Sequence, residues 1–140
     1  MNNRTHNKKI LIIHGPNMNL IALRKTSKNP NITLDKINKF LKKTAKSFNY
    51  ELKIYQTNSE PRAVNIINSH RNRVSKIILF PGPWQSSAYI IKDIIKILNI
   101  PLITISTGEP VNLLNGIFNY NEDDIYKSIE KTFSTISNNN

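Results

Sequence analysis

The strongest constraint on the fold of this chain is an alternation of short, isoleucine-rich apolar runs with longer amphipathic segments. The apolar runs cover residues 9–14, 51–56, 76–80 and 102–105. Parallel strands need long crossover connections, so this alternation is typical of β-α-β units around a parallel sheet. The run at 76–80 is continuously apolar, as expected of a central strand, whereas 51–56 alternates and suits a strand near the edge. We predict an α/β fold with a parallel sheet of four or five strands, the fifth at residues 116–119.

Helical spacing of apolar residues predicts the connecting helices. Thr33 is a candidate N-cap for the first helix, and Ser59 or Asn58 for the second. Pro61 falls in the first turn of the second helix, where a missing N–H is tolerated. The predicted helices cover residues 34–48, 60–72, Ser86 to about residue 98, and 123–136.

The chain is short enough to form one domain. Its 140 residues predict a single domain over 1–140, with residues 1–8 and 137–140 disordered at its ends. It contains no cysteine, and its three histidines lack the spacing of metal ligands, so we expect neither a disulfide nor a metal site. The apolar run Ile10–Ile13 is far too short for a signal or membrane segment, so we expect a cytoplasmic protein that does not contact a membrane.

The formal net charge of +11 raises the question of a nucleic-acid partner. Lys, Asn and Ile are abundant along the whole chain, and the basic residues are spread rather than clustered. Aromatic signatures of RNA-binding modules are also missing. We therefore favour a basic, solvated surface over nucleic-acid binding.

Ligands of open parallel sheets bind outside the carboxyl ends of the strands. Loops rich in Pro, Gly, Asn, Ser and Thr follow residues 14, 80 and 105. In the second loop, Gly82 permits close approach of a backbone, and Ser86 lies at a predicted helix start, where free N–H groups favour an anion. This loop is expected either to bind a carboxylate or phosphate, or to use Ser86 only as a helix cap.

Four motifs in order resemble those of type II 3-dehydroquinate dehydratases. HGPNMNLIALR resembles that family's NGPNLNLLGxRxP signature, and QTNSE resembles its QSNxEG segment. PGPWQSSA with the later Lys92 and Asp93 matches the family's third loop in part, and IPLITIS resembles its strand before the catalytic histidine. The resemblance runs from about Ile10 to Ser106.

The resemblance implies a flavodoxin-like three-layer sandwich that assembles as a homo-oligomer, with trimers packed into dodecamers. It implies an enzyme of the shikimate pathway that needs no cofactor and acts on a small carboxylate. The family removes water from 3-dehydroquinate by a trans elimination through an enolate, giving 3-dehydroshikimate. In the family a loop tyrosine, aided by an arginine, takes the proton. An asparagine with water holds the enolate, and a histidine protonates the leaving hydroxyl.

Carried over by position, Asn17 and Arg24 match the family's catalytic asparagine and arginine. Asp93 matches an aspartate that contacts the substrate, often from an adjacent subunit. The resemblance also places substrate contacts at Phe80, Ser86, Ser106 and Thr107, although the family has asparagine and histidine where this chain has Phe80 and Ser86.

The proton-transfer residues of the family are not matched. The tyrosine position falls near Asn29, and no tyrosine occurs before Tyr50. Ser106 stands at the position of the proton-donating histidine, and Thr104 at that of its supporting glutamate. General acids and bases each contribute roughly 10²- to 10⁴-fold, so two interpretations follow. The chain is an impaired dehydratase, or it is a catalytically inactive paralogue that binds an acidic ligand or a protein partner.

Two other side chains are candidates to replace the missing acid and base. His14 ends the first predicted strand and has an ordinary pKa suited to a base, but it can equally be a hydrogen-bonded loop histidine. Tyr89, early in the third helix, is expected to serve in packing.

Overall fold

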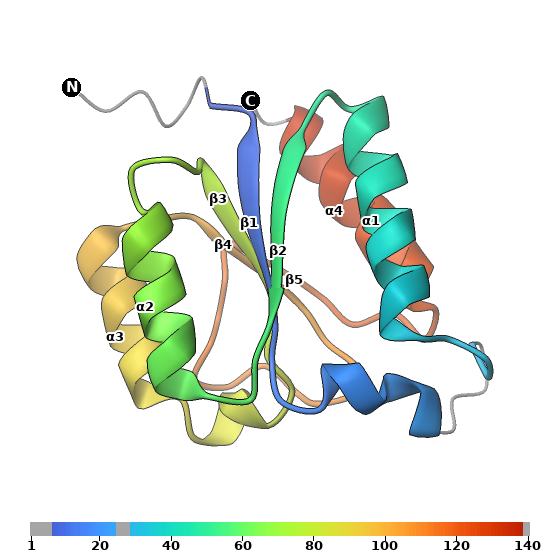
Figure 1. Ribbon diagram of the computed structural model, residues 1–140, viewed down its shortest axis with the longest axis horizontal. Helices are drawn as coiled ribbons and strands as arrows, with labels where there is room; N and C mark the ends of the chain where they lie inside the picture. The colour runs from blue at the N-terminus through green and yellow to red at the C-terminus, as the bar shows by residue number, and fades with distance from the viewer. Residues whose placement is uncertain (1–6, 25–28, 139–140) are drawn as a thin grey trace.

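Five parallel strands form one sheet in the order β2-β1-β3-β4-β5 (Figure 1). The computed structural model describes residues 7–24 and 29–138. The predicted parallel α/β sheet is confirmed, and its strand order is that of flavodoxin-like folds. The fifth strand starts two residues later than predicted. The strands are β1 Lys9–His14, β2 Glu51–Gln56, β3 Lys76–Phe80, β4 Leu102–Ile105 and β5 Phe118–Tyr120.

Two pairs of helices cover the two faces of the sheet and complete the three layers (Figure 1). Helices α1 and α4 lie on one face, and α2 and α3 lie on the other. Two short 3-10 helices, η2 and η3, follow β1 and β3. The helices are α1 Leu34–Ser47, α2 Glu60–His70, α3 Tyr89–Leu98, α4 Ile125–Asn138, η2 Met18–Leu23 and η3 Gly82–Ser86.

The central strand β1 divides the core into two halves. Ile10 and Ile12 belong to the apolar cluster on the α1 and α4 side, whereas Leu11 and Ile13 belong to the cluster on the α2 and α3 side. Successive side chains of a strand point to opposite faces, so a strand covered on both faces is apolar throughout. All four of these residues are fully buried.

Two of the predicted helix starts are confirmed, and the third is wrong. Thr33 Oγ1 accepts a hydrogen bond from the Lys36 N–H, and Ser59 Oγ accepts one from the Arg62 N–H. The third helix starts at Tyr89 rather than at Ser86, because the preceding segment forms the separate helix η3. Ser86 is therefore not its cap.

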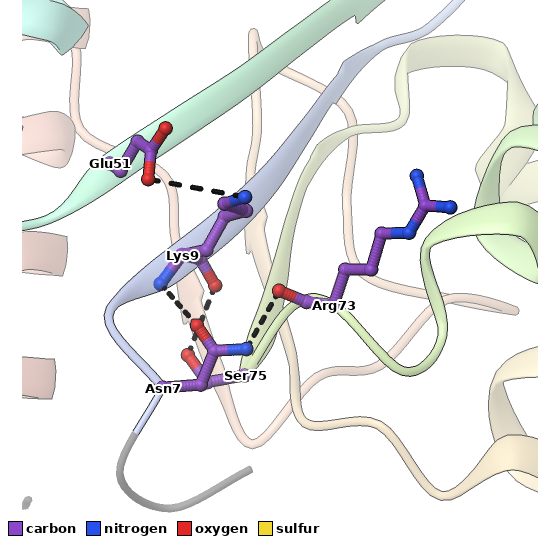
Figure 2. A network of polar contacts seen from close by, with 5 residues as sticks. All are labelled: Asn7, Lys9, Glu51, Arg73 and Ser75. Atoms are coloured by element: carbon purple, nitrogen blue, oxygen red, sulfur yellow. Dashed lines mark hydrogen bonds and ion pairs between the residues drawn. The ribbon is translucent and has the colours of Figure 1, made fainter.

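Both ends of the described chain continue into regular structure. Asn7 Oδ1 accepts the Lys9 N–H and Asn7 Nδ2 donates to the Arg73 carbonyl, each at 2.7 Å (Figure 2). At the same edge, Ser75 donates to the Lys9 carbonyl through its N–H at 2.9 Å and its hydroxyl at 3.3 Å. Helix α4 runs to Asn138, so residues 137 and 138 are helical. Residues 1–6 and 139–140, also expected to be disordered, lie outside the described residues.

None of the helices in the described part of the chain combines the length and the apolar character that crossing a membrane requires.

Candidate functional site at the carboxyl edge of the sheet

A cavity of about 220 Å³ lies beside the loops that follow β1 and β4. Ile21, Ile32 and Ile125 form its apolar wall, and all three are buried in the core on the α1 and α4 side. Arg24 and Thr107 are among the polar residues that line it. The site therefore forms at the carboxyl edge of the sheet, where ligands of such folds bind.

Arg24 and Thr107 meet at this cavity although 83 positions separate them in the sequence. Arg24 follows η2 and is half-buried, and its Nη1 donates to Thr107 Oγ1 at 3.2 Å. A guanidinium carries a permanent positive charge, so Arg24 supplies a fixed cation to the cavity. Asn29 also lines the cavity, and its Oδ1 accepts the N–H of Ile125 at the first turn of α4.

The carboxylate of Glu109 joins the loops that follow β3 and β4. Its Oε1 accepts the Gly82 N–H at 3.1 Å, and its Oε2 accepts the N–H and the hydroxyl of Thr107 at 3.0 and 3.1 Å. Sequence analysis missed Glu109, because a single acidic residue in a turn carries no signal of what it will contact. The structure places it on three donors at the candidate site.

The Ser106 hydroxyl holds together the turn that contains Thr107 and Glu109. It is buried, its hydroxyl donates to the Glu109 carbonyl at 2.6 Å, and the Gly108 N–H donates to that hydroxyl at 3.0 Å. Both polar functions of the hydroxyl are therefore used in holding the turn.

His14 lies inside the core rather than in the cavity. Its Nε2 donates to Asn38 Oδ1 at 2.8 Å, since a carbonyl oxygen can only accept. Its Nδ1 is buried and has no hydrogen-bond partner among the described residues. Burial lowers the pKa of His14 to about 4, although the bond to Asn38 acts in the opposite direction. His14 is therefore neutral at pH 7.

Phe80 packs against His14, with ring centroids 4.4 Å apart, and is itself buried. Its ring lies in the core and is not part of the cavity lining, and its expected contact with substrate stays a prediction.

Comparison with known proteins gives the family. Residues 8–111 match the family model described as dehydroquinase class II. The chain belongs to this family.

Sequences named 3-dehydroquinate dehydratase resemble the chain over about 100 residues. A 3-dehydroquinate dehydratase of Caldanaerobacter subterraneus subsp. tengcongensis is 35% identical over 98 residues, which cover 70% of this chain and 66% of that enzyme. One of Buchnera aphidicola subsp. Acyrthosiphon pisum is 37% identical over 100 residues, covering 71% of this chain and 67% of the other. The matched part thus spans about two thirds of the length of these relatives.

The fold likeness extends further than the sequence likeness. A crystal structure titled type II dehydroquinase from Butyrivibrio crossotus DSM 2876 superposes with a TM-score of 0.79 at 21% identity, covering 94% of this chain and 98% of the other. The C-terminal part of the chain, beyond the family match, therefore follows the same fold as that structure.

Three other predicted site residues lie outside the cavity lining. Asn17 is exposed at the start of η2 in a left-handed conformation, with its N–H donated to Asn58 Oδ1 at 2.9 Å. Ser86 is exposed at the end of η3, and Asp93 is exposed on α3, which covers the opposite face from the cavity's apolar wall. The proposed roles of these residues stay predictions.

The N–H groups expected to bind an anion at the start of the third helix already donate to a carboxylate of this chain. Glu60 Oε2 accepts the N–H groups of Ile90 and Ile91 at 3.0 and 3.2 Å. Tyr89, expected to pack, is 66% exposed instead.

Sequence analysis also missed the connection between β5 and α4. Asn121, Glu122 and Asp123 line the cavity together with Arg24. Lys131 donates to Glu122 at 2.8 Å, and this contact lowers the pKa of the Glu122 carboxyl group. Within the described residues, no group of three or more His, Cys, Asp or Glu is arranged to hold a metal ion.

Proposed function

We propose that this chain binds 3-dehydroquinate at the carboxyl edge of its sheet and dehydrates it to 3-dehydroshikimate far more slowly than a family member with a complete acid and base pair. The observation that carries the proposal is the composition of the cavity. Arg24 is retained and contacts Thr107, whereas Asn29 and Ser106 stand where the resemblance places the base and the acid.

Binding of an anionic substrate is supported by charge. Arg24 offers a fixed cation, and the formal net charge of +11 raises the local concentration of anions around the protein. The apolar wall of Ile21, Ile32 and Ile125 suits the carbon ring of a small substrate.

Slow turnover follows from the lack of a proton carrier. The reaction removes a proton next to the ketone and expels a hydroxyl as water, and neither an amide nor a serine hydroxyl exchanges protons readily near pH 7. His14 is no substitute, because it is enclosed in the core and its pKa is about 4. Loss of both groups is expected to lower turnover by at least about 10³-fold, less than the product of the two separate effects.

A second candidate function is that of an inactive paralogue that binds a carboxylate or a protein partner. The contacts of Glu109 favour a carboxylate ligand over a protein partner. Three donors surround its carboxylate, and donors of this kind can bind a carboxylate without a catalytic acid or base.

Assembly as a homo-oligomer is part of the proposal. Tyr89, Ile90 and Ile97 on α3 are 66%, 57% and 70% exposed, and a second copy of the chain would cover them. Light scattering on the purified protein measures the mass directly, and a monomer at all concentrations would contradict this part.

The deciding experiment measures the enone absorbance that forms from 3-dehydroquinate, in the wild type and in Arg24→Gln. Slow turnover that Arg24→Gln reduces at least about tenfold further supports the proposed dehydratase. A rate equal to that of a complete family member contradicts the impairment. No turnover above buffer, combined with thermal stabilisation by quinate, favours the inactive paralogue.

A further inference from the structure

The donors around Glu109 form a compact receptor for one carboxylate. The Gly82 N–H comes from the loop after β3, and the N–H and hydroxyl of Thr107 come from the loop after β4. Together they engage both oxygens of the Glu109 carboxylate. Hydrogen bonds to an ionised acceptor are roughly twice as strong as those between neutral groups, so this set favours an anion.

Arg24 fixes the direction of the Thr107 hydroxyl. Arg24 Nη1 donates to Thr107 Oγ1 at 3.2 Å and so occupies a lone pair of that oxygen. A hydroxyl has a single proton, which then points to Glu109 Oε2 at 3.1 Å. Arg24 thus polarises the Thr107 hydroxyl, and that hydroxyl donates to the Glu109 carboxylate. The guanidinium and the carboxylate belong to distant parts of the sequence.

The donors are held in place by contacts other than the Glu109 side chain. The Ser106 hydroxyl ties the turn through the Glu109 carbonyl and the Gly108 N–H. Farther along the same loop, the buried amide of Gln85 accepts the N–H groups of Asn112 and Leu114, each at 2.9 Å. The Glu109 side chain can therefore leave while the Thr107 N–H remains where it is.

The receptor also borders the cavity, because Thr107 and Gly108 belong to its lining. A ligand in the cavity could present a carboxylate to the Thr107 donors only by displacing that of Glu109. An intramolecular carboxylate has the advantage of a high effective concentration.

We infer that Gly82 and Thr107 form a carboxylate-binding site which Glu109 fills in the absence of ligand, so that Glu109 competes with the carboxylate of the bound molecule. This inference rests on the proposed function only in taking the ligand to be a small cyclic carboxylate. If Glu109 fills the site about nine-tenths of the time, it weakens the apparent affinity for a carboxylate about tenfold.

The test measures binding of quinate by calorimetry in the wild type, Glu109→Ala and Asp123→Asn. Glu109→Ala is expected to bind quinate about tenfold more tightly. Asp123→Asn is the matched control, because Asp123 lines the same cavity but its removal only reduces negative charge. Quinate methyl ester, which lacks the carboxylate, should bind wild type and Glu109→Ala equally.

Several results would overturn the inference. Equal or weaker quinate binding by Glu109→Ala would mean that Glu109 only ties the two loops together. Equal tightening in Asp123→Asn would mean a general effect of charge. Absence of quinate binding in Glu109→Ala also counts against it, since the freed donors should accept a carboxylate.

Folding and turnover are controlled separately. If Glu109→Ala is too unstable to measure, Glu109→Gln takes its place. This variant keeps the length of the side chain but removes its charge, and it should gain less affinity for quinate than Glu109→Ala. Amide resonances of Gly82 and Thr107 must also shift when quinate saturates the wild type, and unchanged resonances would overturn the inference. Because quinate is not dehydrated, absence of turnover with 3-dehydroquinate would refute the proposed dehydratase while leaving this competition measurable.

Discussion

The Glu60 carboxylate caps helix α3 by accepting the backbone N–H of Ile90 at 3.0 Å. The same Oε2 atom accepts the Ile91 N–H at 3.2 Å. The first N–H groups of a helix have no partner inside the helix, and the helix dipole makes that end favourable for negative charge. Glu60 belongs to the first turn of α2, so this contact also joins the two helices that cover one face of the sheet.

We expect Glu60→Gln to lower the free energy of unfolding by about 1–2 kcal/mol, because it removes a charged acceptor from two helix N–H groups. Urea denaturation measures the change. Glu130→Gln, at an exposed position on α4, is the matched control and should change stability by less than about 0.5 kcal/mol. Equal effects of the two substitutions would show that the cap contributes nothing specific.

Stability should fall with acidity through His14. Its pKa is about 4 in the folded protein and 6.5 when unperturbed. Between these values the unfolded state binds the proton and the folded state does not, so unfolding becomes more favourable as pH falls from about 6.5 to 4. The contribution of His14 is fully present above pH 6.5, and the loss is on the order of 3 kcal/mol at pH 4.

The comparison with His14→Asn isolates this effect, because asparagine does not titrate in this range. Denaturant midpoints measured between pH 4 and pH 7 should fall less steeply in the variant than in the wild type. Parallel curves would mean that His14 is charged or solvated in the folded protein, contrary to its burial.

Gly15 and Gly82 should resist substitution by alanine for different reasons. A Cβ atom on Gly15 would lie 2.7 Å from the Phe80 carbonyl oxygen and 2.9 Å from a ring carbon of Trp84. Overpacking of this kind costs typically 1–3 kcal/mol. Gly82 has room for a Cβ atom, with Pro16 O at 3.6 Å, but its φ of +51° lies in the left-handed region, which costs other residues about 1–2 kcal/mol.

Thermal unfolding of Gly15→Ala and Gly82→Ala checks the ranking. We expect the larger drop in melting temperature for Gly15→Ala, because backbone atoms of the β3 end must move to admit the methyl group. A larger drop for Gly82→Ala would show that the loop after β1 shifts at little cost to admit the methyl group.

The strands were predictable because their information is local. Four strands begin and end where the apolar runs do, because the apolar residues of each short run are wholly or partly buried on folding and polar or turn-forming residues bound the run. Thr33 and Ser59 were predictable as caps for the same reason, because a cap contacts a residue only three positions away. The fifth strand has three residues with half-buried and exposed side chains, and its start was misplaced by two residues.

The start of α3 was mispredicted because its cap comes from another helix. No local pattern around Ser86 reveals that Glu60 will supply the acceptor. The same holds for Glu109, whose partner Gly82 is 27 positions away in the sequence.

By itself, then, the sequence determined the family and the parallel sheet, and it predicted the edge of that sheet at which we propose that a ligand binds, since these depend on periodicity, apolar runs and motifs within short segments. Only the tertiary structure decided which groups meet at that edge. It buried His14 in uncharged form, placed Arg24 on Thr107, and put Glu109 on the carboxylate donors. The physical reason is that hydrogen bonds and desolvation depend on distances between loops, and the packing of both layers of helices sets those distances.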